Sequence, residues 1–232
     1  MIVGFIGQIS LPGISFTGNA GPEQVASALE IVGLLTVLTL APSIVVMLTC
    51  FTRVLIVLSF LRQAIGVPQM PPNQIITGLA LFVTVFIMAP VGQEVHRVAL
   101  GPYLDRKITP GQALERGWTP IRAFLLRHTR EHDLGLMVEL SRQERPARPQ
   151  DVAAHALVPA FVISELRTAF QLAFVLFVPF LVIDMVVASI LMSMGMLMLP
   201  PVMISLPLKI LLFVLADGWH LVIRSLVSSY QS

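Results

Sequence analysis

The stretch that decides the fold runs from Val158 to Leu199, VPAFVISELRTAFQLAFVLFVPFLVIDMVVASILMSMGMLML, and carries only three charges, Glu165, Arg167 and Asp184. A helix rises about 1.5 Å per residue, so a straight helix of this length would span roughly 60 Å, twice the ~30 Å hydrocarbon core of a bilayer. Charges this deep in apolar sequence are costly in lipid and are expected to face protein or a water-filled path. The stretch therefore predicts a long element that needs partners, and not one ordinary transmembrane helix.

The composition of the whole chain indicates a membrane assembly. Of its 232 residues 56% are hydrophobic and 12% are charged, against roughly 25% charged residues in average soluble domains. The mean hydropathy is +0.85. The net charge is only +2 and the basic residues form no dense patch with interleaved aromatics, so nucleic acid is not expected as a partner. The single cysteine, Cys50, has no partner for an intrachain disulfide.

Proline, glycine and charge divide the chain into parts. We predict an N-terminal arm at residues 1–27, a first helical hairpin at 28–91, a polar extramembrane helical insert at 92–157, and a long kinked hairpin with a Met-rich loop and a C-terminal helix at 158–232. The arm lacks a basic n-region, so it does not predict a secretory signal peptide. The first helix is expected to start near Ala28 and to continue to Arg62. The insert holds ten of the fifteen Lys and Arg residues and is expected in water, with helical stretches at 109–117 and 120–140.

Apolar runs predict four nominal spans, and none of them is clean. They cover residues 31–61, 75–91, 168–190 and 202–227, and each contains a proline: Pro42, Pro90, Pro179 or Pro207. A freed carbonyl or an unpaired charge at membrane depth costs several kcal/mol unless neighbouring protein satisfies it. We therefore expect an all-α membrane-associated fold of kinked helical hairpins, packed in a helical or ring oligomer.

Six charged residues inside or beside the apolar runs are candidates for buried or intersubunit pairing: Arg53, Glu165, Arg167, Asp184, Lys209 and Asp217. Glu165 and Arg167 point about 200° apart on a helix, so they are poor partners for each other and good ones for two different neighbours. Pairing with Arg53, Lys209 or Asp184 of another chain is one interpretation. An intrachain pair, a solvated helix end, or a proton relay through Asp184 are the alternatives.

The end of the long run is rich in methionine, at Met192, Met194, Met196 and Met198, with Gly195 among them. Methionine is unbranched and polarizable, so it fills irregular gaps and tolerates rearrangement. If several copies surround an axis, these side chains would form a deformable apolar plug that blocks ions by dewetting. Packing of an ordinary core is the alternative interpretation.

One short motif suggests an enzyme. His128-Thr-Arg-Glu131-His132 matches the H-x-x-E-H pattern of zinc proteases, in which two histidines four residues apart share one helix face. Five residues are a weak signal, and no third ligand at a suitable distance is evident. We therefore expect a surface helix with ordinary histidines, no cofactor and no metal.

Several longer motifs occur in order along residues 40–230. They are Thr49–Val54, Pro71–Gln74, Arg127–Leu134, Ser164–Gln171, Met194–Pro201, Ile204–Lys209 and Leu215–Trp219. Together they resemble the FliP family of flagellar export-gate proteins, which shares ancestry with the R components of virulence type III secretion systems. Pro200-Pro201 and the long polar insert resemble the flagellar branch.

The resemblance implies a pore-forming subunit and not an enzyme. Members of the family form a homo-oligomer, a pentamer, with FliQ-type and FliR-type subunits, and work with FlhB-type and FlhA-type export proteins. The gate lies in the bacterial inner membrane within the flagellar basal body, projects toward the periplasmic side, contacts lipid, and passes unfolded flagellar subunits outward. On the residues alone, a conventional polytopic transporter or channel and a membrane zinc protease remain alternatives.

Overall fold

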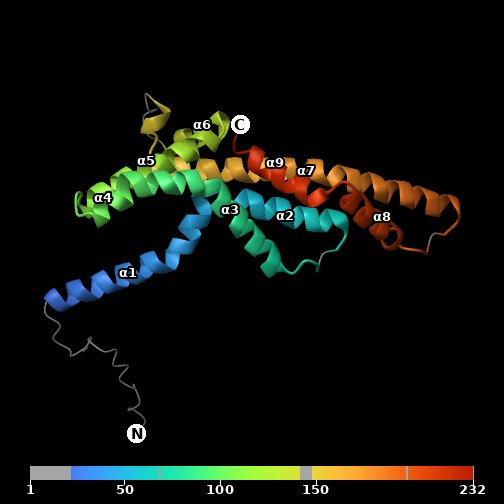
Figure 1. The fold of residues 1–232 in the computed structure, drawn as a ribbon, viewed down its shortest axis with the longest axis horizontal. Helices are drawn as coiled ribbons and strands as arrows, with labels where there is room; N and C mark the ends of the chain where they lie inside the picture. The colour runs from blue at the N-terminus through green and yellow to red at the C-terminus, as the bar shows by residue number, and fades with distance from the viewer. Residues whose placement is uncertain (1–21, 68, 142–147, 197, 232) are drawn as a thin grey trace, which may run out of the picture. The chain divides into compact units, whose positions relative to one another are not determined.

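The computed structural model describes residues 22–67, 69–141, 148–196 and 198–231, and all regular structure within these ranges is helical (Figure 1). Three helices are long and apolar enough to cross a membrane, and a bent pair of helices near the C-terminus would make a fourth span. The all-α membrane fold class predicted from the sequence is thus confirmed. Packing in an oligomer stays a prediction.

The chain divides into two compact units, the first ending at Ile44 and the second beginning at Val45. Helix α1, Pro22–Met47, includes a membrane-capable segment of 19 residues, Leu29–Met47, that buries none of its side chains. The helix continues through Pro42. It also begins at Pro22, six residues before the expected start at Ala28, and proline is well suited to a first helical turn because its missing N–H has no partner there. The rest of the predicted arm, 1–21, lies outside the described residues.

The predicted helix from Ala28 to Arg62 was wrong, because the structure contains two helices there. Helix α1 ends at Met47, and α2, Phe51–Ile65, begins after a short turn. In this turn the Thr49 hydroxyl accepts a hydrogen bond from the Phe51 N–H at 3.4 Å. Such a local side-chain bond competes with the helical pattern of the backbone.

The second arm of the first hairpin is longer than residues 75–91. Helix α3, Asn73–Val95, continues through Pro90 into a π-helical turn, His96–Leu100, and a short α4, Gly101–Leu104. Together they form a membrane-capable segment of 32 residues. Several of the residues assigned to the polar insert therefore prolong an apolar helix.

The insert is helical, but its break was predicted in the wrong place. Helix α5, Pro110–His128, opens with a capping box between Thr109 and Gln112 and continues through Pro120, where the sequence predicted a gap. The break instead precedes α6, Glu131–Leu140, because the Arg130 N–H donates to Ser164 Oγ of another helix at 3.0 Å. After a 3-10 turn, Pro149–Asp151, α7 begins at Ala154, so the last residues of the predicted insert belong to the long helix.

The long apolar run is one helix as far as Ser193. Helix α7, Ala154–Ser193, has 40 residues and passes Pro159 and Pro179 without a break. It is followed by α8, Pro201–Leu215, and α9, Gly218–Ser228, which are bent by 63° relative to each other. The predicted span at 202–227 is therefore a broken one.

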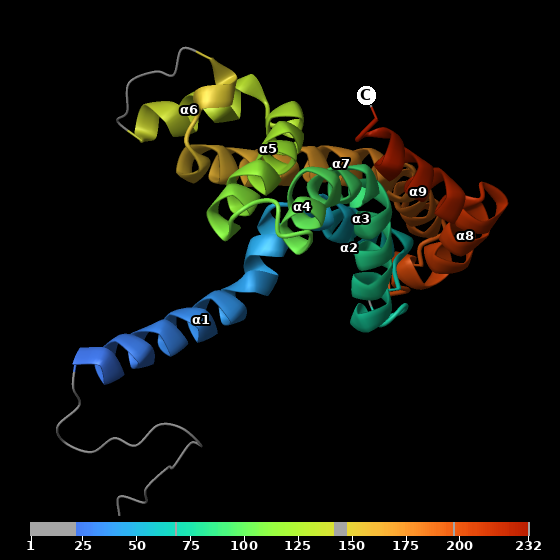
Figure 2. The same ribbon diagram turned by 60° about the vertical axis from the view of Figure 1, so that its left-hand side comes forward.

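Within the second unit, α7 is the central rod (Figures 1 and 2). Helix α2 packs along it more extensively than any other pair of helices, and α5, α6 and α8 also contact it. The side chains that close this core are fully buried: Val54, Leu58, Leu61, Leu125, Leu157 and Phe161. Further along α7, in contrast, large apolar side chains such as Phe174 are mostly exposed. Exposed apolar surface of this extent marks a lipid or protein contact.

The elbow between α8 and α9 depends on a glycine. A Cβ atom at Gly218 would lie 2.1 Å from Cε2 of Phe213, whose ring packs edge-on against Trp219 at 5.5 Å. Gly218→Ala should therefore push this aromatic pair apart and destabilise the protein by about 1–3 kcal/mol. The measurement is the unfolding temperature of the detergent-solubilised protein.

Gly78→Ala is the matched control, because Gly78 lies within α3 with open space around its Cα. Its unfolding temperature should be unchanged or slightly higher, since alanine favours a helix. Equal behaviour of the two variants would contradict the close approach at Gly218.

Candidate functional site

The centre of the second unit holds a buried ion pair that joins α2 to α7. Arg53 is 3% exposed and Glu165 is fully buried. Arg53 Nε donates to Glu165 Oε2 at 3.1 Å, and its Nη2 forms a salt bridge with the other carboxylate oxygen. A buried pair of this kind survives only when further hydrogen bonds replace the lost water. The pair found here lies within one chain, whereas pairing between chains was one of the sequence interpretations.

The C-terminal end of the chain completes this cluster. The Tyr230 hydroxyl donates to Glu165 Oε2, and Arg53 Nη1 donates to Ser229 Oγ at 3.1 Å. The Arg53 guanidinium also lies 3.9 Å from the centroid of the Tyr230 ring, a cation–π contact. Burial raises the pKa of the Tyr230 phenol, so it stays a hydrogen-bond donor. Sequence analysis missed Ser229 and Tyr230, although a tyrosine in an apolar context usually finds a partner for its hydroxyl.

A second ion pair, between a buried lysine and a half-buried aspartate, closes the hairpin of α7 and α8. Lys209 Nζ lies 2.6 Å from Asp184 Oδ2, and the Ser205 hydroxyl donates to Asp184 Oδ1 at 2.5 Å. Lys209 is 4% exposed. The carboxylate thus has both a cation and a hydroxyl partner within the hairpin, so its contacts here are those of a structural bridge.

A third polar contact holds α6 against α7. Asp133 is 4% exposed, and its Oδ2 accepts a hydrogen bond from Ser164 Oγ at 2.7 Å. The same Ser164 oxygen accepts from the Arg130 N–H. Arg130, Asp133 and Ser164 belong to the sequence motifs described above, but no role could be predicted for them. Nothing in the sequence places a residue of the insert beside α7.

Arg167 and Asp217, the two remaining charges, differ from the other four. Both are exposed, and neither makes a salt bridge or a side-chain hydrogen bond with any residue that the structure describes. Asp217 sits at the elbow between α8 and α9 in the left-handed conformation, φ 48°. Their pairing between subunits stays a prediction.

The methionine-rich loop lies between α7 and α8. Helix α7 ends in a Schellman motif: the Met196 N–H donates to the Leu191 carbonyl at 3.0 Å, the Gly195 N–H donates to the Met192 carbonyl at 3.1 Å, and Gly195 has φ 74°. Met192, Met194 and Met196 are 59%, 67% and 41% exposed, and Met198 is 99% exposed. Leu197 lies outside the described residues. These methionines do not fill a core within the chain, which removes the alternative of intrachain packing for Met198.

The zinc-protease motif requires His128 and His132 to share one helix face, and the structure does not place them so. His128 is the last residue of α5 and His132 belongs to α6, so the two histidines do not share one helix face. The His132 side chain is 80% exposed, whereas His128 packs against Phe124 and Tyr230 with ring centroids 4.7 Å and 5.0 Å apart. In the part of the chain that the structure describes, no three His, Cys, Asp or Glu side chains are placed to hold a metal.

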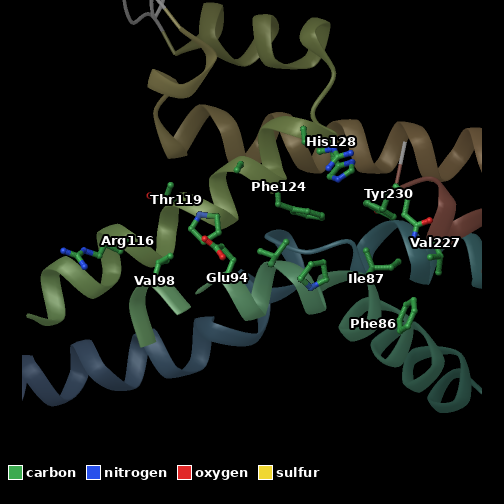
Figure 3. A pocket seen from close by; sticks show the side chains of 16 residues that line it. Phe86, Ile87, Glu94, Val98, Arg116, Thr119, Phe124, His128, Val227 and Tyr230 are labelled. Carbon is green, nitrogen blue, oxygen red and sulfur yellow. The ribbon is translucent and has the colours of Figure 1, made fainter. Parts of the chain in front are cut away.

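His128 lines a cavity of about 1080 Å³ between α3, α5 and the C-terminal end. Figure 3 shows Phe86 and Ile87 of α3 on one side and Phe124, His128 and Tyr230 on the other. Burial, with help from the positive charge of Arg53 and Arg127, lowers the pKa of His128 to about 4. The imidazole is therefore neutral at pH 7.

These observations define a polytopic helical membrane protein with buried ion pairs and an exposed methionine loop at the tip of its longest hairpin. A model of the FliP family matches residues 34–226, so the chain belongs to the FliP family. The family predicted from the sequence motifs is confirmed. Together with the membrane-capable helices, it makes the chain a membrane protein of flagellar biosynthesis.

Three relatives illustrate how closely the chain follows the family. It is 52% identical over 217 residues to the flagellar biosynthetic protein FliP of Bacillus subtilis (strain 168), which covers 94% of this chain and 98% of the relative. It is 49% identical over 219 residues to that of Cereibacter sphaeroides, covering 94% and 73%. It is 50% identical over 214 residues to that of Pectobacterium carotovorum subsp. carotovorum, covering 92% and 83%.

The first test of this site concerns the central ion pair. Glu165→Ala would leave Arg53 buried without its carboxylate, which should lower the free energy of unfolding by about 3–5 kcal/mol. The unfolding temperature of the solubilised protein measures the loss. Glu139→Ala, at an exposed position of α6, is the control and should change little. If Arg53→Met combined with Glu165→Leu is no more stable than Glu165→Ala, the burial of an unpaired charge is not the cause.

The second test concerns pH. Because the pKa of His128 is lowered from 6.5 to about 4 in the folded protein, the unfolded chain binds more protons between these values. This contribution to stability is fully present above pH 6.5 and is lost as the pH falls toward 4. His128→Gln should therefore flatten the fall in unfolding temperature between pH 7 and pH 4.5. His132→Gln, at an exposed position, should not; identical profiles for all three proteins would contradict the assignment.

Proposed function

We propose that this chain is the pore-forming subunit of a flagellar type III protein export gate, with the loop from Met192 to Met198 as its deformable seal. The observation that carries the proposal is the exposed methionine loop at the tip of the α7–α8 hairpin in a chain of the FliP family. An ordinary soluble loop places polar side chains in water. Four exposed methionines instead suit a surface that meets copies of itself.

The seal would consist of the methionine-rich loop and its stem, the helices α7 and α8 that lead into and out of the loop. The stem is held by the bridge of Asp184 with Lys209 and Ser205, and the Schellman turn at Gly195 ends α7 sharply. Repeated around an axis, the loops bring flexible apolar side chains to a narrow point. A dry apolar constriction blocks ions, and methionine can rearrange around a chain that passes through.

Partners and location follow from the same proposal. Several copies, a pentamer, assemble with FliQ-type and FliR-type subunits, and the complex works with FlhB-type and FlhA-type proteins to pass unfolded flagellar subunits. The gate lies in the inner membrane within the flagellar basal body and projects toward the periplasmic side. The exposed apolar faces of α1 and α7 support contacts with lipid and with neighbouring subunits. The relatives described above are flagellar proteins, which favours the flagellar branch over a virulence secretion system.

Trimming the loop tests the seal. Met194→Ala, Met196→Ala and Met198→Ala together remove apolar volume from every copy, so a dry constriction should widen and admit water and ions. The purified complex in a planar bilayer should show a new conductance, and cells should grow more slowly under salt stress. The complex itself should remain intact, because the loop follows the packed helix.

Met70→Ala with Met185→Ala is the matched control, since both side chains are more than half exposed but lie outside the loop. It should conduct no more than the unmodified complex. Intact triple-variant complexes with unchanged conductance would refute the seal. Met198→Ala alone, at the most exposed position, gives a second measurement if the triple variant assembles poorly.

A further inference from the structure

Six charges were singled out from the sequence, and pairing within the chain leaves one cation and one anion of these six over. Arg53 pairs with Glu165, and Asp184 pairs with Lys209. Arg167 and Asp217 are exposed and have no ionic partner among the described residues. Both lie in or next to helices with the length and apolar character of membrane spans. A charge in such a setting is expected to face protein or water and to pair.

The surroundings of Arg167 form a shaped apolar site. Arg167 lines a cavity of about 940 Å³ between α2 and α7, and the other lining residues are mostly aromatic or aliphatic: Phe60, Phe170, Gln171, Ala173, Phe174, Val175 and Phe177. We call this the phenylalanine pocket. Phe60 and Phe170 meet edge-on at 5.6 Å and form one wall, while Phe174 is 71% exposed. The pocket is thus open, apolar, and positive at one point.

The surroundings of Asp217 form a complementary projection. The elbow between α8 and α9 turns the chain by 63°, and Asp217 at its tip does not cap α9 with its side chain. Leu215 beside it is 75% exposed and Trp219 is 41% exposed. The elbow therefore presents an aliphatic and an aromatic side chain around a single carboxylate.

We propose that the α8–α9 elbow of one copy docks into the phenylalanine pocket of a neighbouring copy, where Asp217 pairs with Arg167. The apolar side chains of the elbow would fill the pocket and exclude water from the ion pair, which strengthens it. Pocket and projection are different surfaces of the same chain, so the contact is head-to-tail. A contact of this type repeats from copy to copy and generates a ring or a helix. The inference rests on the proposed function in one respect, the assembly of several copies.

Cross-linking between two differently marked copies tests this contact directly. One copy carries Arg167→Cys and a second, with a different affinity tag, carries Asp217→Cys, and both are expressed together with the partner subunits. A short bismaleimide linker is used because an arginine spans more than the separation that a disulfide allows. Cys50 is fully buried, so the reagent does not reach this native thiol and it can remain in place.

The expected result is a dimer band that carries both tags. It should not form when Arg224→Cys, an exposed cation on α9, replaces Arg167→Cys. An equal band with Arg224→Cys, or no band while both cysteine copies reach wild-type amounts in the membrane, would overturn the proposal.

Charge reversal gives a second, independent result. Arg167→Glu and Asp217→Arg should each lower the fraction of multimer by roughly tenfold or more, because each places like charges together in the contact. The double variant restores an opposite pair and should recover the multimer. Arg224→Glu combined with Asp217→Arg should not recover it. If either cysteine copy fails to accumulate, this measurement decides, and a double variant no better than the single ones overturns the proposal.

A further pair of variants tests whether Arg167 pairs with a carboxylate other than Asp217. Glu30, an exposed carboxylate on α1, is a possible rival for Arg167. If Glu30→Arg rescues Arg167→Glu and Asp217→Arg does not, Asp217 is not the partner. The mass of the unmodified complex separates this proposal from the proposed function. A multimer that lacks the contact between 167 and 217 refutes only the contact, whereas a monomer refutes the assembly itself.

Discussion

The buried salt bridge between Arg53 and Glu165 is the interaction on which the rest of the structure depends. Both ions have lost almost all contact with water, so their mutual contact, the hydrogen bonds that Arg53 donates to Ser229 and Glu165 accepts from Tyr230, and the cation–π contact with Tyr230 compensate the cost of burial. This requirement holds α2 at one register along α7. It also requires the C-terminal end to return over both helices, and it accounts for the packing of Tyr230 against Phe124 of α5.

The same constraint explains which surface remains free. The polar groups of α7 that face α2, α6 and α8 are satisfied inside the chain, through Glu165, Ser164 and Asp184. The apolar side chains of α7 beyond the core, in contrast, are not covered by the chain, and Phe170 and Phe174 are exposed. A helix of 40 residues cannot bury its whole apolar surface against partners of 10 to 19 residues. The remainder is available to lipid and to other subunits.

The two ends of α8 show how backbone geometry places functional groups. At its start, the left-handed Gly195 stops α7 and exposes the methionines of the loop. At its end, the left-handed Asp217 and the close contact of Gly218 with Phe213 turn the chain into α9. In the proposed gate, the first turn presents the seal and the second presents the contact to the next copy. A rigid stem between them, held by Lys209 and Asp184, would keep the two in a fixed relation.

The sequence by itself determined the fold class, the family, the membrane-capable helices and the residues that need partners. These follow from local properties: apolar length, charges in apolar runs, and motifs that keep their order. Helix limits were less accessible, because α5 continues through Pro120, where a gap was predicted, whereas the chain turns at Thr49 inside a stretch predicted as one helix.

Only the tertiary structure decided which charges meet. Arg53 and Glu165 are 112 positions apart, and Tyr230 is 65 positions from Glu165, so no periodicity or spacing connects them. The tertiary structure likewise separated His128 from His132 by ending α5 between them, and it left Arg167 and Asp217 without a partner among the described residues. The physical reason is that ion pairing acts through space, whereas sequence patterns report only what neighbouring residues along a helix have in common.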